Sequence, residues 1–219
     1  MRMSPGRRPK NGIFPIRAKP TTTSIIPINT KTFPKPENSG GNIPAIMIAR
    51  KEERMNEVLR AIRERRSIRV FRPDPVEPEK LEAILEAARW APSGRNTQPW
   101  RFVVVESKEK REELGRVVTQ MDMIRTAPVT IAVLRDKDAG YDETKDIQAI
   151  GACAQNILLA AHSLGLGACW LGRLRDPQVE KIIGAKENEE LMMLIVIGYP
   201  RERPAPRERK PLSELVRRI

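Results

Sequence analysis

The chain has 219 residues, with 40 Lys and Arg against 28 Asp and Glu, one His, two Cys and 4% aromatic residues. This length suffices for one domain, or for one domain with an attached segment. The longest apolar run, residues 191–198, is too short to span a bilayer, and no signal-like stretch follows the basic start. Two cysteines form neither a disulfide framework nor a zinc site, and one His excludes a multi-histidine metal centre. We therefore expect a soluble, cytoplasmic protein without a metal site.

The net charge of +12 is concentrated in the first 54 residues, which hold 11 Lys and Arg, 3 Asp and Glu, and 8 of the 19 prolines. No hydrophobic periodicity runs through them, so they cannot bury enough surface to offset the entropy of ordering. We predict that residues 1–54 are a disordered, basic, Pro-rich extension and that a folded domain covers 55–219. Two alternatives stay open: a basic arm for nucleic acid or anionic lipid, and a start site assigned too far upstream of Met55. The charges are scattered and lack interleaved aromatic residues, which argues against a nucleic-acid or membrane partner.

From residue 55 onward, helical and strand-like periodicities follow one another without strict alternation. A polar loop from Ser93 to Pro99 separates the second helix from the first strand. Such a mixture is typical of a layered α+β domain. The predicted helices cover about 55–66, 78–91, 108–118, 144–164 and 177–183, and the predicted strands cover 101–106, 129–134, 168–171 and 191–197.

The helix predicted over 144–164 is apolar on both sides. Ile147, Ile150 and Leu158 lie on one side, and Ala149 and Cys153 on the other. We expect it to be buried nearly all round, in a core or at a subunit interface.

Three glycines, Gly165, Gly167 and Gly172, superficially resemble a dinucleotide-binding fingerprint. That fingerprint needs a strand before the glycines and a helix after them, whereas here a helix precedes and a strand follows. We therefore interpret Gly165 and Gly167 as the left-handed end of the long helix.

A basic cluster stands where the first helix gives way to an extended segment. In an extended chain Ser67 and Arg69 share one face, and Arg65 can join them, which gives two guanidiniums and a hydroxyl for phosphate recognition. The alternative is a solvated basic helix end. A second basic cluster at residues 207–210 either completes the same site or forms a tail.

The remaining reactive side chains have plain structural interpretations. His162 lies among apolar residues of the long helix with no acidic partner at helical spacing. Cys169 lies in a strand with no neighbouring cation in the sequence. We predict both to be packing residues.

Several motifs in one order resemble the nitroreductase family of FMN-dependent oxidoreductases. The resemblance covers about residues 55–219. Each motif alone is weak evidence for the family, but five motifs in the same order are specific for it. The motifs are Arg65-Arg66-Ser67-Ile68-Arg69, the run from Ala91 to Val105, Gln155-Asn156-Ile157-Leu158 with Gly165–Gly172 after it, Ile197-Gly198-Tyr199-Pro200, and Arg209-Lys210-Pro211-Leu212.

The resemblance implies a layered α/β/α domain with a mostly antiparallel central sheet, and an obligate homodimer with FMN bound between the protomers. Arg65 and Ser67 correspond to residues on the phosphate and ribityl chain, and Arg69 to one near flavin N1 and O2. The loop with Pro92, Ser93 and Asn96 is expected to reach the flavin of the other protomer. The full set of implied cofactor-binding residues is Arg65, Arg66, Ser67, Arg69, Pro92, Ser93, Asn96, Gln98, Trp170, Leu171, Gly172, Arg207 and Arg209.

The resemblance also implies the activity. FMN takes hydride from NADH or NADPH and passes it to a nitroaromatic, quinone or related small-molecule acceptor by a ping-pong mechanism. No catalytic side chain is then needed, because the flavin carries the chemistry. A guanidinium beside N1 and O2 would stabilise the negative charge of reduced flavin. The alternative is a flavin-binding or redox-sensing protein with little turnover.

Overall fold

The structure is a computed structural model that describes residues 56–118, 121–172 and 176–219. These residues belong to the unit Ala45–Ile219. The predicted extension over residues 1–54 lies outside the described residues. The two alternatives for this segment, a basic arm and a start site assigned too far upstream, concern the same residues.

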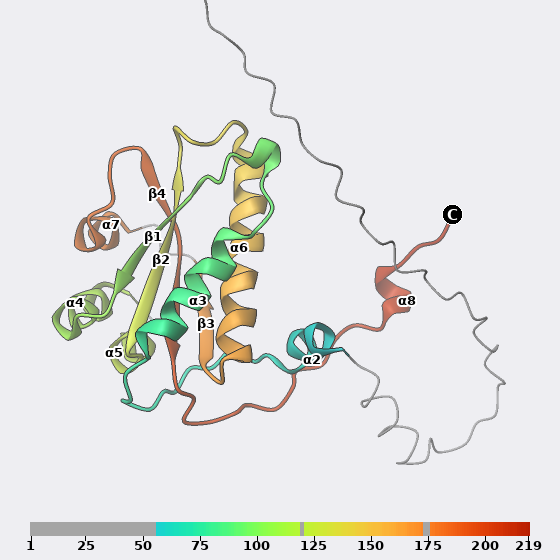
Figure 1. The fold of residues 1–219 in the computed structure, drawn as a ribbon, viewed down its shortest axis with the longest axis horizontal. Coiled ribbons are helices and arrows are strands. Elements are labelled where there is room, and N and C mark those ends of the chain that lie inside the picture. Colours follow the sequence, from blue (N-terminus) through green and yellow to red (C-terminus); the bar gives the residue numbers. More distant parts are fainter. Residues whose placement is uncertain (1–55, 119–120, 173–175) are drawn as a thin grey trace, which may run out of the picture. The chain divides into compact units, whose positions relative to one another are not determined.

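A four-stranded sheet forms the middle of the domain (Figure 1). Its strand order is β1-β2-β4-β3, and all neighbouring pairs are antiparallel. The central strands carry β-branched and aliphatic residues that are buried on both faces, as expected for a sheet covered by helices on two sides. The strands are β1 (Trp100–Val105), β2 (Val129–Asp136), β3 (Gly167–Leu171) and β4 (Glu189–Gly198).

Alternate residues of β2 divide between two cores. Ile131 and Val133 belong to the core under α3 (Pro78–Arg89) and α6 (Glu143–Ser163), which pack against each other. Figure 1 shows these two helices side by side on one face of the sheet. Pro78 occupies the first helical position of α3, where its missing N–H costs nothing.

Three further helices cover the opposite face. Leu114 of α4 (Lys108–Val117), Ile124 of α5 (Met121–Thr126) and Val179 of α7 (Pro177–Ile183) are fully buried there. They share a core with Ala132 and Leu134 of β2. The domain is therefore a layered α/β/α fold of the α+β class, and the predicted fold class is confirmed.

One sequence interpretation at the end of the long helix needs correction. Ile147 on the apolar face of α6 is 44% exposed in the single chain, so its expected burial falls to a subunit interface and not to the core. Gly165 has φ +78° and follows the helix as predicted, with the Leu166 N–H donating to the Ala161 carbonyl. Gly167 instead begins β3 without a positive φ, and a glycine is needed there because a Cβ would lie 2.7 Å from the Ile68 side chain.

Two segments of the domain lie mostly outside the cores. Helix α2 (Glu57–Glu64) exposes Val58, Leu59 and Ile62, and residues 201–219, which include α8 (Leu212–Leu215), are exposed throughout. Within the described ranges, no helix is both long and apolar enough to cross a membrane.

Candidate functional site

The first basic cluster follows directly on α2. Arg65 ends the helix with an extended backbone conformation, and Ser67 then pairs in parallel with Ala168 of β3. The Ile68 N–H donates to the Ala168 carbonyl at 3.0 Å, and the Ile68 side chain is buried. Since side chains alternate along an extended chain, Ser67 and Arg69 face away from Ile68.

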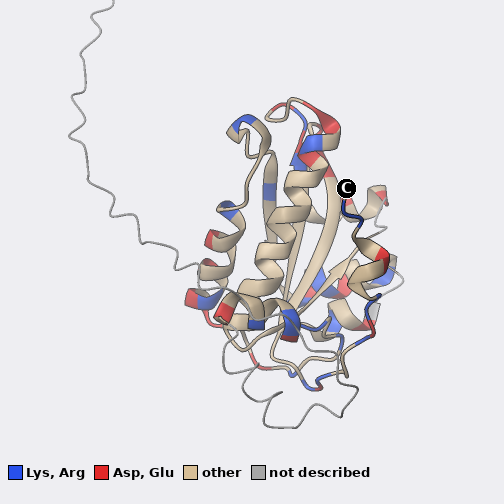
Figure 2. Cartoon of the chain, turned by 90° about the vertical axis from the view of Figure 1, so that its right-hand side faces the viewer, with Lys and Arg blue, Asp and Glu red and all other residues tan. Residues whose placement is uncertain are grey.

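The two basic clusters meet around one cavity of about 900 Å³. Arg65, Ser67 and Arg69 line it from one side, and Arg207 and Arg209 line it from the exposed C-terminal segment. Basic residues, blue in Figure 2, recur along this segment. The second cluster is therefore not a separate tail. The residues that line the cavity are Arg60, Ile62, Arg63, Glu64, Arg65, Arg66, Ser67, Arg69, Pro204, Ala205, Pro206, Arg207 and Arg209.

The cavity concentrates positive charge. Burial lowers the pKa of Arg65, and the nearby charges of Arg209 and then Arg66 lower it further. Among the described residues, no carboxylate forms an ion pair with the cavity arginines. An anion with several oxygen acceptors would satisfy these donors and relieve the repulsion between them.

Backbone carbonyls take part of the donor capacity of the cluster. The Arg66 guanidinium donates to the Arg63 and Arg65 carbonyls at 2.7 and 3.0 Å, and Arg69 donates to the Ser67 carbonyl at 3.3 Å. Arg209 donates through one nitrogen to the carbonyls of Arg207 and Glu208. Each guanidinium retains further N–H groups, because arginine carries five donors.

The end of β3 lies beside the arginine cavity without lining it. Trp170 is 40% exposed and Leu171 is buried, while Gly172 is the last described residue before the gap at 173–175. Burial raises the pKa of Cys169, and the charges of Arg69 and Arg65 act on that pKa in the opposite direction. The strand end is thus within electrostatic reach of the cluster.

The third predicted group, the loop after α3, lies elsewhere in the same chain. Pro92 and Ser93 line a second cavity of about 360 Å³. Asn96 and Gln98 follow in the same loop, with φ of 57° and 50°. None of the four lines the arginine cavity of its own chain. The second cavity is completed by Gly94 and by Lys145, Gln148, Ala149 and Ala152 of α6.

Sequence reasoning missed three arginines near the first cluster. Arg60 and Arg63 of α2 line the main cavity, and Arg203 lines a small cavity of about 30 Å³ beside it. His162 lines the same small cavity, where burial and then the charge of Arg203 lower its pKa. For Arg60 and Arg63 the available signal was helical spacing, because Arg63 stands three residues before Arg66 of the first cluster. No sequence signal placed Arg203 beside His162.

The geometry defines a three-layer α+β domain with an arginine-lined cavity. A family model described as the nitroreductase family matches residues 62–121 and 116–199. The chain belongs to this family, as predicted.

Individual relatives match most of the folded domain in sequence, and one solved structure matches it in fold. An Archaeoglobus fulgidus protein is 37% identical over 153 residues, which cover 68% of this chain and 88% of that protein. It is named for an inferred NADH dehydrogenase or NAD(P)H nitroreductase activity. The NADPH-flavin oxidoreductase of Vibrio harveyi is 31% identical, over 74% of this chain and 73% of that one. A Desulfovibrio desulfuricans protein, described as an inferred nitroreductase and solved in complex with FMN, superposes with a TM-score of 0.69 at 40% identity, over 75% of this chain and 98% of its own. The predicted enzyme class and cofactor agree with these names.

Proposed function

We propose that the chain is an FMN-dependent NAD(P)H oxidoreductase whose arginine cavity holds the FMN phosphate. The observation that carries the proposal is the convergence of Arg65, Ser67 and Arg209 on one cavity without a described carboxylate partner. A phosphate monoester supplies the charge and the acceptors that this donor set needs. The FMN in the Desulfovibrio relative supports the same assignment.

The other residues of the cluster have distinct tasks in this proposal. Arg66 and Arg207 add charge around the phosphate, and Ser67 donates its hydroxyl to the phosphate or the ribityl chain. Arg69 stands next to β3, and we assign it to flavin N1 and O2, where a cation favours the reduced state. The backbone of Trp170, Leu171 and Gly172 would hold the ring, with an amide available to N5. Bound FMN supplies the hydride chemistry, so no side chain acts as acid, base or nucleophile.

The proposed functional unit is a homodimer. The loop residues Pro92, Ser93 and Asn96 do not line the arginine cavity of their own chain, and we assign them to the cavity of a second copy. Exposed apolar residues on α2 and on the C-terminal segment, such as Ile62, Leu212 and Leu215, offer surface for that contact. Gln98 is assigned to the same loop contact.

We further propose that a nitroaromatic, quinone or related small molecule is the acceptor. The nicotinamide and the acceptor would use the same open flavin face in turn, which predicts ping-pong kinetics. Parallel lines in double-reciprocal plots at several acceptor concentrations support this order, and intersecting lines refute it. A cytoplasmic location is part of the proposal, because both cysteines are free and buried, as is common in reducing compartments.

Anaerobic reduction of the purified protein tests the proposed activity. We expect a yellow protein that NADH or NADPH bleaches and that regains its colour on addition of an acceptor. A yellow protein that neither nicotinamide bleaches would instead be a flavin-binding or sensing protein. A chain that binds no FMN would refute the proposal altogether.

A further inference from the structure

The loop that follows α3 is held in an unfavourable backbone conformation. Arg95, Asn96 and Gln98 have φ of 52°, 57° and 50°, in the left-handed region that residues with a Cβ seldom adopt. Such conformations persist only where the surroundings enforce them, and they cluster at functional sites. The loop needs contacts from outside to keep its shape.

Bonds within the loop fix only part of it. The Asn96 and Thr97 N–H groups donate to the Ser93 and Gly94 carbonyls at 3.1 Å, and the Gln98 N–H donates to Ser93 Oγ at 3.0 Å. These bonds close the turn. They do not orient it against the rest of the domain.

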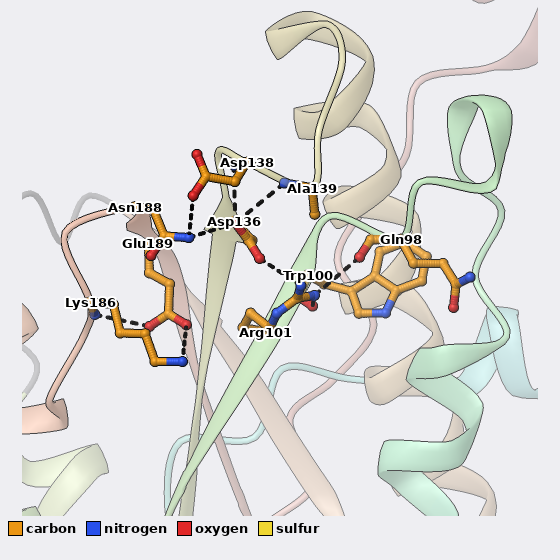
Figure 3. A network of polar contacts seen from close by, with 9 residues as sticks. All are labelled: Gln98, Trp100, Arg101, Asp136, Asp138, Ala139, Lys186, Asn188 and Glu189. Atoms are coloured by element: carbon orange, nitrogen blue, oxygen red, sulfur yellow. Dashed lines mark hydrogen bonds and ion pairs between the residues drawn. The ribbon is translucent and has the colours of Figure 1, made fainter. Parts of the chain in front are cut away.

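The C-terminal end of the loop is anchored by a polar network (Figure 3). The Asp136 N–H donates to the Pro99 carbonyl at 2.7 Å, and the Asp136 carboxylate forms an ion pair with Arg101 at 2.5 Å. The Arg101 guanidinium also donates to the Trp100 carbonyl at 2.8 Å and to the Gln98 carbonyl at 3.4 Å. These contacts hold the loop from Gln98 onward and do not reach Arg95 or Asn96.

At the front of the loop, the Tyr141 side chain lies against Gly94. A Cβ at Gly94 would collide with the Tyr141 hydroxyl and would lie 2.6 Å from Cε1, so the ring edge lies directly against the Gly94 backbone. The Arg95 guanidinium lies over the same ring, 4.7 Å from its centroid, and the Lys145 ammonium lies 5.3 Å from it. Tyr141 thus joins the left-handed residue Arg95 to the first turns of α6.

We propose that Tyr141 is a positioning residue for the cofactor site. Its ring holds the loop in the conformation that presents Ser93 and Asn96 to the flavin of the other protomer. The inference rests on the proposed function, since it assigns a task to a residue that touches the loop and not the cofactor. Attraction to Arg95 comes from the ring, and the ring edge lies against Gly94 together with the hydroxyl, so the ring carries most of the contact.

The test compares Tyr141→Leu, which removes the ring, with Tyr141→Phe, which keeps it. Trp90→Leu is the matched control, because Trp90 is an exposed aromatic residue at the end of α3 whose side chain contacts Glu86 and Arg89. FMN is titrated into each apoprotein while flavin fluorescence is followed. We expect the Kd for FMN to rise about tenfold in Tyr141→Leu, and to stay within about twofold of the wild-type value in the other two variants.

Two further readouts separate positioning from stability. The melting temperature of the apoprotein should be the same for Tyr141→Leu and for the wild type, because Tyr141 is 37% exposed. Gly94→Ala should weaken FMN binding in the wild-type background and weaken it less in the Tyr141→Leu background, because the ring that the new Cβ strikes is then gone.

The outcomes distinguish this inference from the proposed function. A wild-type chain that binds no FMN overturns both. FMN binding by the wild type with an unchanged Kd in Tyr141→Leu overturns the positioning role alone, and so does a Tyr141→Phe variant that loses as much affinity as Tyr141→Leu.

Discussion

Arg65 and Arg209 come from opposite ends of the folded domain and line the same cavity, where the charge of Arg209 helps to lower the pKa of Arg65. Two guanidiniums held this close repel each other unless an anion lies between them. Arg65 is fixed by the end of α2 and by the pairing of the next residues with β3. Arg209 belongs to an exposed segment. A bound phosphate would therefore link the exposed C-terminal segment to the end of α2.

Replacement of either arginine should weaken FMN binding. In Arg65→Ala or Arg209→Ala we expect a loss of about 1.5–3 kcal/mol, or about 10- to 150-fold in Kd, because each variant removes a charge-assisted contact. Equilibrium titration of the apoprotein with FMN measures this. Arg116→Ala is the control, since Arg116 is exposed on α4 and belongs to no described ion pair. Equal losses in all three variants would show that only net charge matters.

Both cysteines should resist thiol reagents in the native protein. Burial raises the pKa of Cys153 to about 12 and also raises that of Cys169. At pH 8 a thiol of pKa about 12 is ionised in about one molecule in ten thousand, and the thiolate is the reactive form. A colorimetric disulfide reagent should therefore label the chain only after denaturant is added. Rapid labelling of the native protein would contradict the buried positions of both residues.

The network around Asp136 should contribute to stability as well as to loop geometry. Asp136 Oδ1 accepts from the Asn188 side chain at 2.9 Å and from the Asp138 N–H at 3.0 Å, and the other oxygen pairs with Arg101. In Asp136→Ala we expect the free energy of unfolding to fall by about 2–4 kcal/mol, because several donors lose their buried acceptor.

Urea denaturation measures that loss. The control is Asp138→Ala, which removes one exposed acceptor of the Asn188 side chain and should cost about 1 kcal/mol or less. A similar loss in both variants would mean that the buried carboxylate has no special role.

The ionisation of the Glu86 carboxyl tests the side-chain contacts at the end of α3. Hydrogen bonds from Arg89 and then from the Trp90 indole lower the pKa of Glu86 to about 2. A carboxyl with a lowered pKa stabilises the folded state above its unfolded pKa, and that contribution is lost as the pH falls toward about 2. An NMR titration should show this low value in the wild type and a clear rise in Arg89→Gln. An unchanged pKa in the variant would exclude Arg89 as the main cause.

Much of the fold was predictable because each element has a strong local pattern. The apolar spacing of Leu81, Ile84 and Ala88 predicted α3, and its burial followed. The β-branched runs predicted β1, β2 and β4 to within a few residues. Ile147 lies outside the core, since helical periodicity records which face is apolar and not whether that face packs in the core or against a second copy.

The site was predictable only in part. The alternation of Ser67 and Arg69 indicated a phosphate cluster, but the contribution of Arg207 and Arg209 depended on where a long exposed segment runs. Tyr141 carried no signal, because its contact with Gly94 joins two loops that are distant in sequence. Contacts of this kind arise from tertiary packing and leave no local pattern.

The most direct test of the arginine cavity compares FMN with riboflavin, which lacks the phosphate, by calorimetric titration of the apoprotein. If the cavity holds the phosphate, the wild type should bind FMN at least about 100-fold more tightly than riboflavin, and most of that difference should vanish in the double variant Arg65→Ala, Arg209→Ala. Equal affinities for the two ligands in the wild type, or an unchanged ratio in the double variant, would contradict the account.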